Sequence, residues 1–354
     1  MKKLLLLPII ILGSFSSFGQ VLDQEDFDAL ILGNIATDIT GAAAGQGDYF
    51  VFASNGAAPT TTSNSAVSNV QIVADGNDSQ GLQITGVNGD KGSRFMWKDG
   101  FVDLWSGRTA GNNIIELEVD INPGDGTSTS RNTFGVSIFN AAGDRVLAGF
   151  NVRAATRELF FVVYSTPTGN PVGSYNYSLA AAPGIQLPAD VFSRIGISYN
   201  KTTGVARIKG PGIPAAGLTV NGSATGTDPA EIDYVSFSGN VVATPNTSSA
   251  TMVIDNLLVK ASSTDTLLNV ASIDLSENNF SIYPNPAKNV INFSNNVNAI
   301  VDAIELFDIN GRIVKSVKLN ATQGQFSVSD LATGMYMVKI STTAGTVTKK
   351  IVKH

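Results

Sequence analysis

Three carboxylates, Glu116, Glu118 and Asp120, alternate along one apolar stretch of the chain. Successive side chains of a β-strand point to opposite faces, so these three share a face, with neighbours about 7 Å apart. Glycosidases hold two carboxyl groups about 5 to 5.5 Å apart (retaining) or about 6.5 to 9.5 Å apart (inverting), so adjacent members suit glycoside hydrolysis. The polar face of a half-buried strand explains the same alternation. We predict no catalytic residue here, and a glycoside-active enzyme that uses Glu116 and Glu118 is the alternative.

The sequence lacks the residues that most other catalytic mechanisms require. The chain has no cysteine, and its one histidine, His354, is the last residue. Ser-His-Asp triads, Cys-His dyads and histidine-ligated zinc sites are therefore excluded from the region before the tail.

Aromatic residues that can stack on sugars gather between positions 94 and 108. Phe95 and Trp97 share one face of an expected strand and are predicted to belong to the core. Trp105 lies in a stretch rich in Gly, Ser and Asp and is predicted to be exposed. Polar side chains nearby can hydrogen-bond hydroxyl groups, so the predicted ligand-binding residues are Trp105, Arg108, Asn112 and Asn113. The alternative is that these rings cap one edge of the core.

Charge divides unevenly along the chain. Residues 20–279 carry 13 basic and 25 acidic side chains, a net charge of 13 − 25 = −12, whereas residues 280–354 carry 8 and 4, a net charge of 8 − 4 = +4. An acidic surface repels a phosphate backbone, which argues against nucleic acid as a partner. The basic segment 280–354 therefore differs electrostatically from the acidic region before it.

The region between the two ends is predicted to be all-β. Thirty-five glycines and only 15% charged residues are typical of an extracellular β protein. No stretch of this region has a helical period, and none approaches the roughly 20 apolar residues of a membrane helix. Alternating apolar runs predict at least eleven strands and hence two packed sheets, at 69–74, 82–87, 94–98, 114–122, 134–140, 146–151, 159–165, 194–200, 205–209, 232–239 and 251–260.

One hairpin and one late strand indicate the kind of sandwich. Ile195, Ile197 and Tyr199 alternate with small residues, residues 200–204 form a turn, and residues 205–208 return as the partner strand. This pattern resembles the late hairpin of laminin-G and concanavalin-like jelly rolls, and residues 254–257 resemble their closing strand. The resemblance implies a jelly-roll sandwich over residues 20–260, a fold common among glycan binders and glycosidases, although fold alone does not fix function.

The same resemblance implies a structural calcium ion, bound by acids of the first strand and an aspartate of the closing strand. Asp23, Glu25 and Asp255 occupy such positions. Calcium prefers oxygen ligands, and no softer ligand is available in the region. Asp255 as the cap of a turn is the alternative. A second acidic stretch, residues 75–79, lacks the glycine and the final glutamate of a calcium loop and is predicted to be a plain turn.

The two ends of the chain carry addressing signals. Lys2 and Lys3 precede an apolar segment at 4–12, and Ser17 and Gly19 are small residues at the positions that a signal peptidase reads, so residues 1–19 are predicted to be a signal peptide. Residues 261–279, rich in Ser, Thr and Asp, are predicted to be a linker. Residues 280–354 combine short apolar alternations with turn signals, which predicts a small β-sandwich.

Four spaced motifs in this tail resemble the type A C-terminal sorting domain of the type IX secretion system of Bacteroidetes. The resemblance implies export across the outer membrane, contact with the secretion machinery, removal by a sortase-like peptidase, and release or attachment to surface lipopolysaccharide. A generic immunoglobulin-like module is the alternative. The motif residues are Tyr283, Pro284, Asn285, Pro286, Asp308, Gly311, Arg312, Gly334, Tyr336 and Lys349.

We therefore predict a protein of the cell surface or medium that carries a non-catalytic, glycan-binding or adhesive sandwich. A glycoside-active enzyme and a passive structural surface protein are the other candidates.

Overall fold

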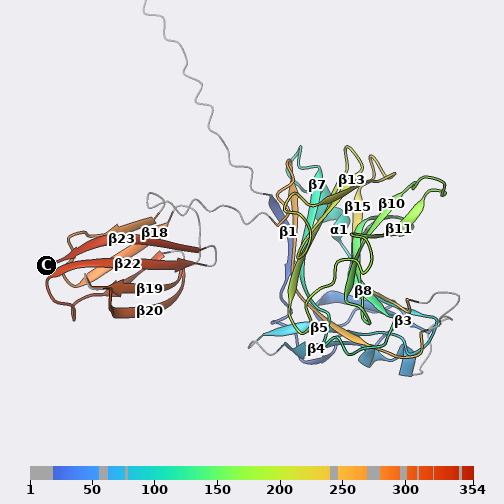
Figure 1. Ribbon diagram of the computed structural model, residues 1–354, viewed down its shortest axis with the longest axis horizontal. Helices are drawn as coiled ribbons and strands as arrows, with labels where there is room; N and C mark the ends of the chain where they lie inside the picture. The colour runs from blue at the N-terminus through green and yellow to red at the C-terminus, as the bar shows by residue number, and fades with distance from the viewer. Residues whose placement is uncertain are drawn as a thin grey trace, which may run out of the picture. The chain divides into compact units, whose positions relative to one another are not determined.

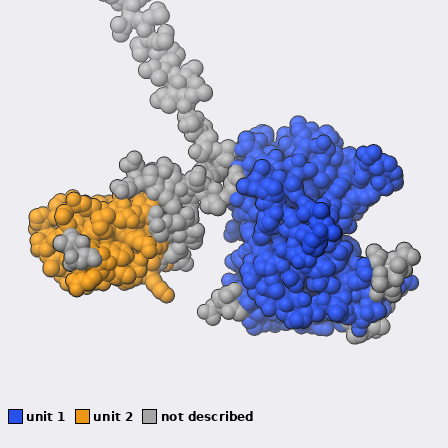
Figure 2. Space-filling model, in the orientation of Figure 1, with its two compact units in different colours: residues 1–268 blue, residues 269–354 orange. Residues whose placement is uncertain are grey.

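The computed structural model describes residues 19–55, 63–75, 79–239, 246–268, 280–295, 301–308, 311–321, 323–342 and 345–354. The chain forms two compact units, residues 1–268 and 269–354 (Figure 2). The predicted signal peptide, apart from Gly19, lies outside the described residues, as do the middle of the predicted turn at 75–79 and the segment 269–279. No helix among the described residues is long and apolar enough to cross a membrane.

The first unit is a sandwich of two antiparallel sheets (Figure 1), which confirms the predicted all-β jelly-roll class. Within the described residues, sheet A has nine strands in the order β14 (Leu218–Asn221), β13 (Val205–Lys209), β12 (Ser193–Asn200), β7 (Ile114–Asn122), β16 (Thr251–Ser262), β5 (Gln80–Thr85), β4 (Val70–Ala74) and β2 (Gly33–Asn34), with β1 (Gln20–Glu25) paired to β16. Sheet B has seven, in the order β11 (Gly173–Ser178), β10 (Glu158–Ser165), β9 (Val146–Arg153), β8 (Thr133–Asn140), β15 (Pro229–Phe237), β6 (Ser93–Lys98) and β3 (Tyr49–Ser54).

The core lies between the inner faces of the two sheets. Leu117 of β7 and Ile197 of β12 face it from sheet A, and Val136 of β8 and Phe161 of β10 face it from sheet B; all four are fully buried. Their neighbours along each strand face outwards because strand side chains alternate. The outer faces of the sheets are therefore the surfaces on which a site can be built.

Helical structure is short. The stretch that contains Trp105 forms one helix, α1 (Phe101–Ser106), where the sequence shows no helical period. Three 3₁₀ turns are η1 (Gln46–Asp48), η2 (Ser63–Ser65) and η3 (Val67–Asn69). All eleven predicted strands are present, and the sequence patterns miss β1, β2, β3, β11 and β14.

The first unit continues beyond the predicted end of the sandwich. Ala261 and Ser262 belong to β16, and Leu267 is fully buried next to Gly196 of β12. Residues 261–268, which the sequence assigns to the linker, are therefore part of the first compact unit.

The second unit is a small β-sandwich, as predicted. Within the described residues it contains a three-stranded sheet, β17 (Phe280–Tyr283), β18 (Val290–Asn295) and β21 (Gln323–Ser327). Its other sheet runs in the order β20 (Ile313–Ala321), β19 (Val301–Phe307), β22 (Gly334–Thr342) and β23 (Gly345–Lys353). Ile304, Val338 and Ile351 are fully buried in its own core.

Candidate functional site

The outer face of sheet B contains a hollow of about 520 Å³. Strands β8, β9, β10 and β11 form it, and the end of β15 closes one side; in Figure 1 the β10–β11 hairpin is the green arm at the edge of the unit. We call this depression the hollow. Its lining mixes apolar and hydroxyl or amide side chains and comprises Thr133, Ser137, Phe139, Val146, Asn151, Arg153, Phe160, Val162, Ser174, Asn176, Phe237, Ser238 and Gly239.

Strand register explains why the sheet is indented here. Gly135 of β8 is paired with Asn151 of β9, and Gly149 of β9 is paired with Ser137 of β8, so two outward positions in the middle of the sheet have no side chain. The long side chains of Phe160 and Arg153 stand at neighbouring positions. Bare backbone next to large side chains leaves a depression.

Asn151 supplies the most informative polar group of the hollow. Its side chain is only 6% exposed, and its Nδ2 donates a hydrogen bond to Oδ1 of Asn176 at 2.9 Å. Its own Oδ1 is buried and accepts no hydrogen bond from the described residues. A buried amide oxygen that accepts no hydrogen bond lowers the free energy of unfolding. A ligand hydroxyl or a water molecule could donate the missing hydrogen bond.

The charge of the hollow is balanced. Arg153 is its only charged lining residue among those described, and it forms an ion pair with Glu158 at 3.1 Å. The guanidinium of Arg153 also lies 4.7 Å from the centre of the Phe160 ring. This pairing orients the Phe160 ring and leaves no uncompensated positive charge at that end of the hollow.

Five half-buried rings continue the same face from the hollow to β3, and we call them the aromatic row: Phe50, Phe52, Phe95, Trp97 and Phe237. Phe50 and Trp97 are stacked, with ring centres 5.7 Å apart. Phe95 contacts Phe237 edge to face at 5.6 Å and Phe52 at 6.4 Å. The prediction that Phe95 and Trp97 belong to the core is therefore wrong.

The inward positions of β6 belong instead to Arg94 and Met96, both of which are fully buried. The guanidinium of Arg94 donates to the carbonyl oxygens of Ser54 and Thr85, so its charge is accommodated without a carboxylate. Burial lowers the pKa of Arg94 to about 10. Alternation identified the two faces of this strand correctly but not which of them points inwards.

Two carboxyl groups of β15 share the outer face of sheet B with the hollow. Asp233 is only 5% exposed and lies opposite Ser137, and Glu231 lies opposite Phe139. Burial raises the pKa of both groups, and for Asp233 the neighbouring Glu231 carboxyl raises it further. The pair consequently retains a proton at a pH where exposed carboxyl groups are ionised.

Trp105 is not exposed, and this prediction is wrong. The ring is 2% exposed, and its Nε1 donates a 2.6 Å hydrogen bond to the carboxylate of Asp228. The guanidinium of Arg108 lies 3.9 Å from the ring centre and donates to the side-chain oxygen of Asn113 and to backbone carbonyls. Asn112 donates to the carbonyl of Ala261. The four residues predicted to bind a ligand are thus brought together, but they are engaged with each other and with the fold.

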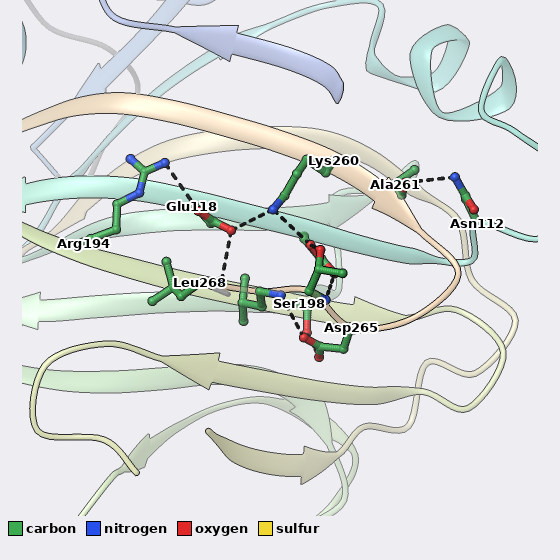
Figure 3. A network of polar contacts seen from close by, with 11 residues as sticks. Asn112, Glu118, Arg194, Ser198, Lys260, Ala261, Asp265 and Leu268 are labelled. Atoms are coloured by element: carbon green, nitrogen blue, oxygen red, sulfur yellow. Dashed lines mark hydrogen bonds and ion pairs between the residues drawn. The ribbon is translucent and has the colours of Figure 1, made fainter. Parts of the chain in front are cut away.

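Glu116 and Glu118 are also engaged within the fold. Glu116 is fully buried and accepts hydrogen bonds from the amide and the hydroxyl of Thr266. Glu118 accepts a 3.0 Å hydrogen bond from the amide of Leu268. Lys260 lies 3.3 Å from Glu116 and 2.9 Å from Glu118. Figure 3 shows the contact between Lys260 and Glu118. The two glutamates hold the end of the first unit against sheet A and do not form a solvated face of the strand.

Each of the three predicted calcium ligands has its own hydrogen-bond or ion-pair partner. Glu25 forms an ion pair with Lys98 at 2.8 Å, and Asp23 accepts a hydrogen bond from the amide of Gln24. Asp255 accepts hydrogen bonds from the amide and side chain of Asn256. Among the described residues, no three His, Asp or Glu side chains are arranged to hold a metal ion. Calcium binding at Asp23, Glu25 and Asp255 stays a prediction.

Burial raises the pKa of Asp255 to about 7, and the nearby carboxylates of Asp75, Asp120 and Asp28 add to the rise. The folded state therefore binds this proton more tightly than the unfolded state, in which an aspartate has a pKa of about 3.9. Stability from this group is present below about pH 4 and is lost as the pH rises towards about 7.

We expect the melting temperature of the first unit's transition to fall between pH 5 and pH 8, and Asp255→Asn to make this fall shallower. Asn keeps an oxygen that accepts the hydrogen bond of the Asn256 amide and removes the charge. Calorimetry at several pH values measures the slope. The exposed Asp103→Asn is the control and is expected to leave the slope unchanged; an equal slope in wild type and Asp255→Asn contradicts the prediction.

The predicted sorting residues have structural roles in the second unit. Asn285 accepts a hydrogen bond from the amide of Val352 and donates one to the carbonyl of Lys350. Asp308 and Arg312 form an ion pair at 2.8 Å. Gly311, at φ +78°, supplies the left-handed position of that turn.

The other motif residues lie in or next to strands of the same unit. Lys349 donates a hydrogen bond to the carbonyl of Phe280, and Tyr336 donates one to the carbonyl of Ala332. Gly334 begins β22, and the ring of Tyr283 is about half exposed. Pro284 and Pro286 flank Asn285 directly after β17.

The first unit is thus a jelly-roll sandwich with a hollowed sheet face, followed by a separate small β unit. Residues 281–354 match the family model of the secretion system C-terminal sorting domain, so the second unit is a sorting domain of type IX secretion. Such a tail indicates contact with the type IX machinery and export to the cell surface or beyond it.

No curated protein sequence shows significant similarity to the chain. Among solved structures, the alginate lyase vAL-1 from Chlorella virus is similar over 68% of this chain and 100% of its own, with 12% identity and a TM-score of 0.40. The alginate lyase Aly36B matches 67% of this chain and 95% of its own, with 17% identity and a TM-score of 0.36. The binding domain of botulinum neurotoxin serotype C1 matches 93% and 74%, with 12% identity and a TM-score of 0.38. These similarities are too distant to assign an activity.

Proposed function

We propose that the protein is an exported, non-catalytic glycan-binding protein and that its binding site is the hollow of sheet B. The observation that carries the proposal is the composition of the hollow: half-buried rings beside amides and hydroxyls, with a buried Asn151 oxygen that lacks a donor. Sugars present apolar faces and hydroxyl groups together, and both kinds of group have partners here. Small-molecule sites are typically concave and apolar with a few well-placed polar groups.

Asn176 offers a direct test. Its side chain is exposed and reaches the hollow through its hydrogen bond with Asn151, so Asn176→Ala removes a ligand contact without opening the core. We expect the affinity of the secreted protein for its best ligand on a glycan array to fall about tenfold, which equals about 1.4 kcal/mol. Because the buried Nδ2 of Asn151 loses its acceptor, we expect the free energy of unfolding to fall by about 1 to 3 kcal/mol while the fold is retained.

Asn170→Ala is the matched control, because Asn170 is an exposed residue between β10 and β11 that does not line the hollow. It is expected to keep wild-type affinity. Equal affinity of all three proteins would place the ligand elsewhere, and the absence of any glycan ligand on a broad array would remove the proposal.

A glycoside-active enzyme is the second candidate, and one observation favours it. Glu116 and Glu118 are engaged in structural contacts, but Glu231 and Asp233 lie on β15 opposite Phe139 and Ser137, two lining residues of the hollow, and burial raises the pKa values of both. A protonated carboxyl beside a carboxylate is the usual acid and base pair of glycoside hydrolysis. Release of reducing ends from a bound polysaccharide by wild type, and its loss in Glu231→Gln, would establish the enzyme.

A further inference from the structure

The hollow is one end of a longer surface. Strand pairing places seven outward positions in a continuous line across sheet B, each being the register partner of the next. The line begins in the aromatic row and passes Val235, whose side chain is fully buried, and Gly135. It then crosses the hollow at Asn151 and Phe160 and ends at Ser178, the partner of Phe160 on β11. It consists of Phe52, Phe95, Val235, Gly135, Asn151, Phe160 and Ser178.

The dimensions of this line suit a chain rather than a single sugar. Neighbouring strands lie about 4.8 Å apart, so seven strands span roughly 29 Å across six gaps. Phe50 and Trp97, stacked on each other, lie beside the far end of the line, opposite the end occupied by the hollow. A ligand chain that follows this line could stack on the rings at one end and hydrogen-bond to the amides at the other.

The charges on this face select against an anionic ligand. Asp233 and Glu231 lie on the outer face of β15, the strand between the aromatic row and β8. The cation that lines the hollow, Arg153, is already paired with Glu158. The carboxyl groups of Asp233 and Glu231 would therefore repel an anionic polymer, and no unpaired cation among the described lining residues would attract it. A neutral polymer is not repelled.

We propose that sheet B binds an extended, uncharged polysaccharide across its strands, with the hollow and the aromatic row as two successive subsites. This inference rests on the proposed function and specifies its ligand class and its length. A ligand that occupies the hollow alone reaches Phe237 but not the other four rings of the aromatic row. A longer chain of the same sugar gains both sets of contacts.

The experiment titrates the secreted protein with trisaccharides and hexasaccharides of cellulose, mannan and laminarin, and with alginate hexasaccharide, by calorimetry. We expect at least one neutral hexasaccharide to bind about tenfold more tightly than its trisaccharide, or about 1.4 kcal/mol. Phe50→Leu is expected to abolish this gain and leave the trisaccharide affinity unchanged. Asn176→Ala is expected to weaken both lengths equally.

Phe95→Leu serves as the second variant in case Phe50→Leu disturbs β3, and melting curves identify a folding defect in either protein. Equal affinity for both lengths would overturn the extended site while leaving the glycan-binding proposal intact. Tighter binding of alginate than of any neutral hexasaccharide would overturn the uncharged ligand class. Absence of binding by every oligosaccharide would overturn this inference, and the absence of any ligand on a broad glycan array would overturn the proposed function as well.

Discussion

Deletion of residues 334–354 is expected to abolish secretion. The deletion removes β22, which pairs with β19, and β23, which pairs with β22, and it removes Gly334, Tyr336 and Lys349 with them. The sorting domain then loses Val338, Ile340 and Ile351 from its core and cannot present an intact surface to the export machinery. Immunoblots of medium, cell surface and periplasm measure where the protein accumulates, and we expect it in the periplasm alone.

Lys288→Ala, an exposed position in the same domain, is the control and is expected to be secreted normally. Secretion of the truncated protein at the wild-type level would contradict the assignment of the second unit as the export signal. The first unit does not include the deleted residues, so its own melting transition is expected to be unchanged.

Lys260→Ala is expected to destabilise the first unit by about 3 to 5 kcal/mol, the cost of leaving a buried ion pair with one partner. Lys260 is the cation between Glu116, which is fully buried, and Glu118. Without it the two carboxylates repel each other, and the segment that they hold, which contains Thr266 and Leu268, is released. Chemical denaturation of the secreted protein measures the loss.

Two further proteins make this prediction specific. The triple variant Lys260→Met, Glu116→Gln, Glu118→Gln removes all three charges, and we expect it to recover much of the lost stability, because replacing a buried ion pair with neutral groups is often tolerated. Lys91→Ala, at an exposed position, is expected to change the free energy of unfolding by less than about 0.5 kcal/mol. A Lys260→Ala protein as stable as Lys91→Ala would show that the network contributes nothing.

The sequence predicts the fold class, the strands with regular alternation and the sorting tail, because these depend on local periods and short motifs. The outcome for β6 shows the limit of that information. Alternation correctly separates Phe95 and Trp97 from Arg94 and Met96, but the direction of the core depends on the other strands. Arg94 faces inwards because carbonyl oxygens of Ser54 and Thr85 receive it there.

Local sequence patterns also do not predict the candidate site, because it depends on contacts between residues that are far apart in the sequence. Glu116 is buried by a segment 150 residues away, and Trp105 meets Asp228 123 residues away. The hollow depends on Gly135, Gly149 and the edge strand β11, which has no predicted counterpart. A signal was nevertheless present for part of the hollow, since Gly149 and the polar Asn151 share one face of the predicted strand at 146–151, whereas Arg153 lies beyond its predicted end.

The most direct test of glycan binding at the hollow is hydrogen–deuterium exchange of the secreted protein with and without its best ligand from a glycan array. We predict slower exchange of the backbone amides in β9, β10 and β11, which border the hollow, and unchanged exchange around Trp105 and in sheet A. Protection confined to residues 101–113, or no protection in β9 to β11 at a saturating ligand concentration, would contradict the account.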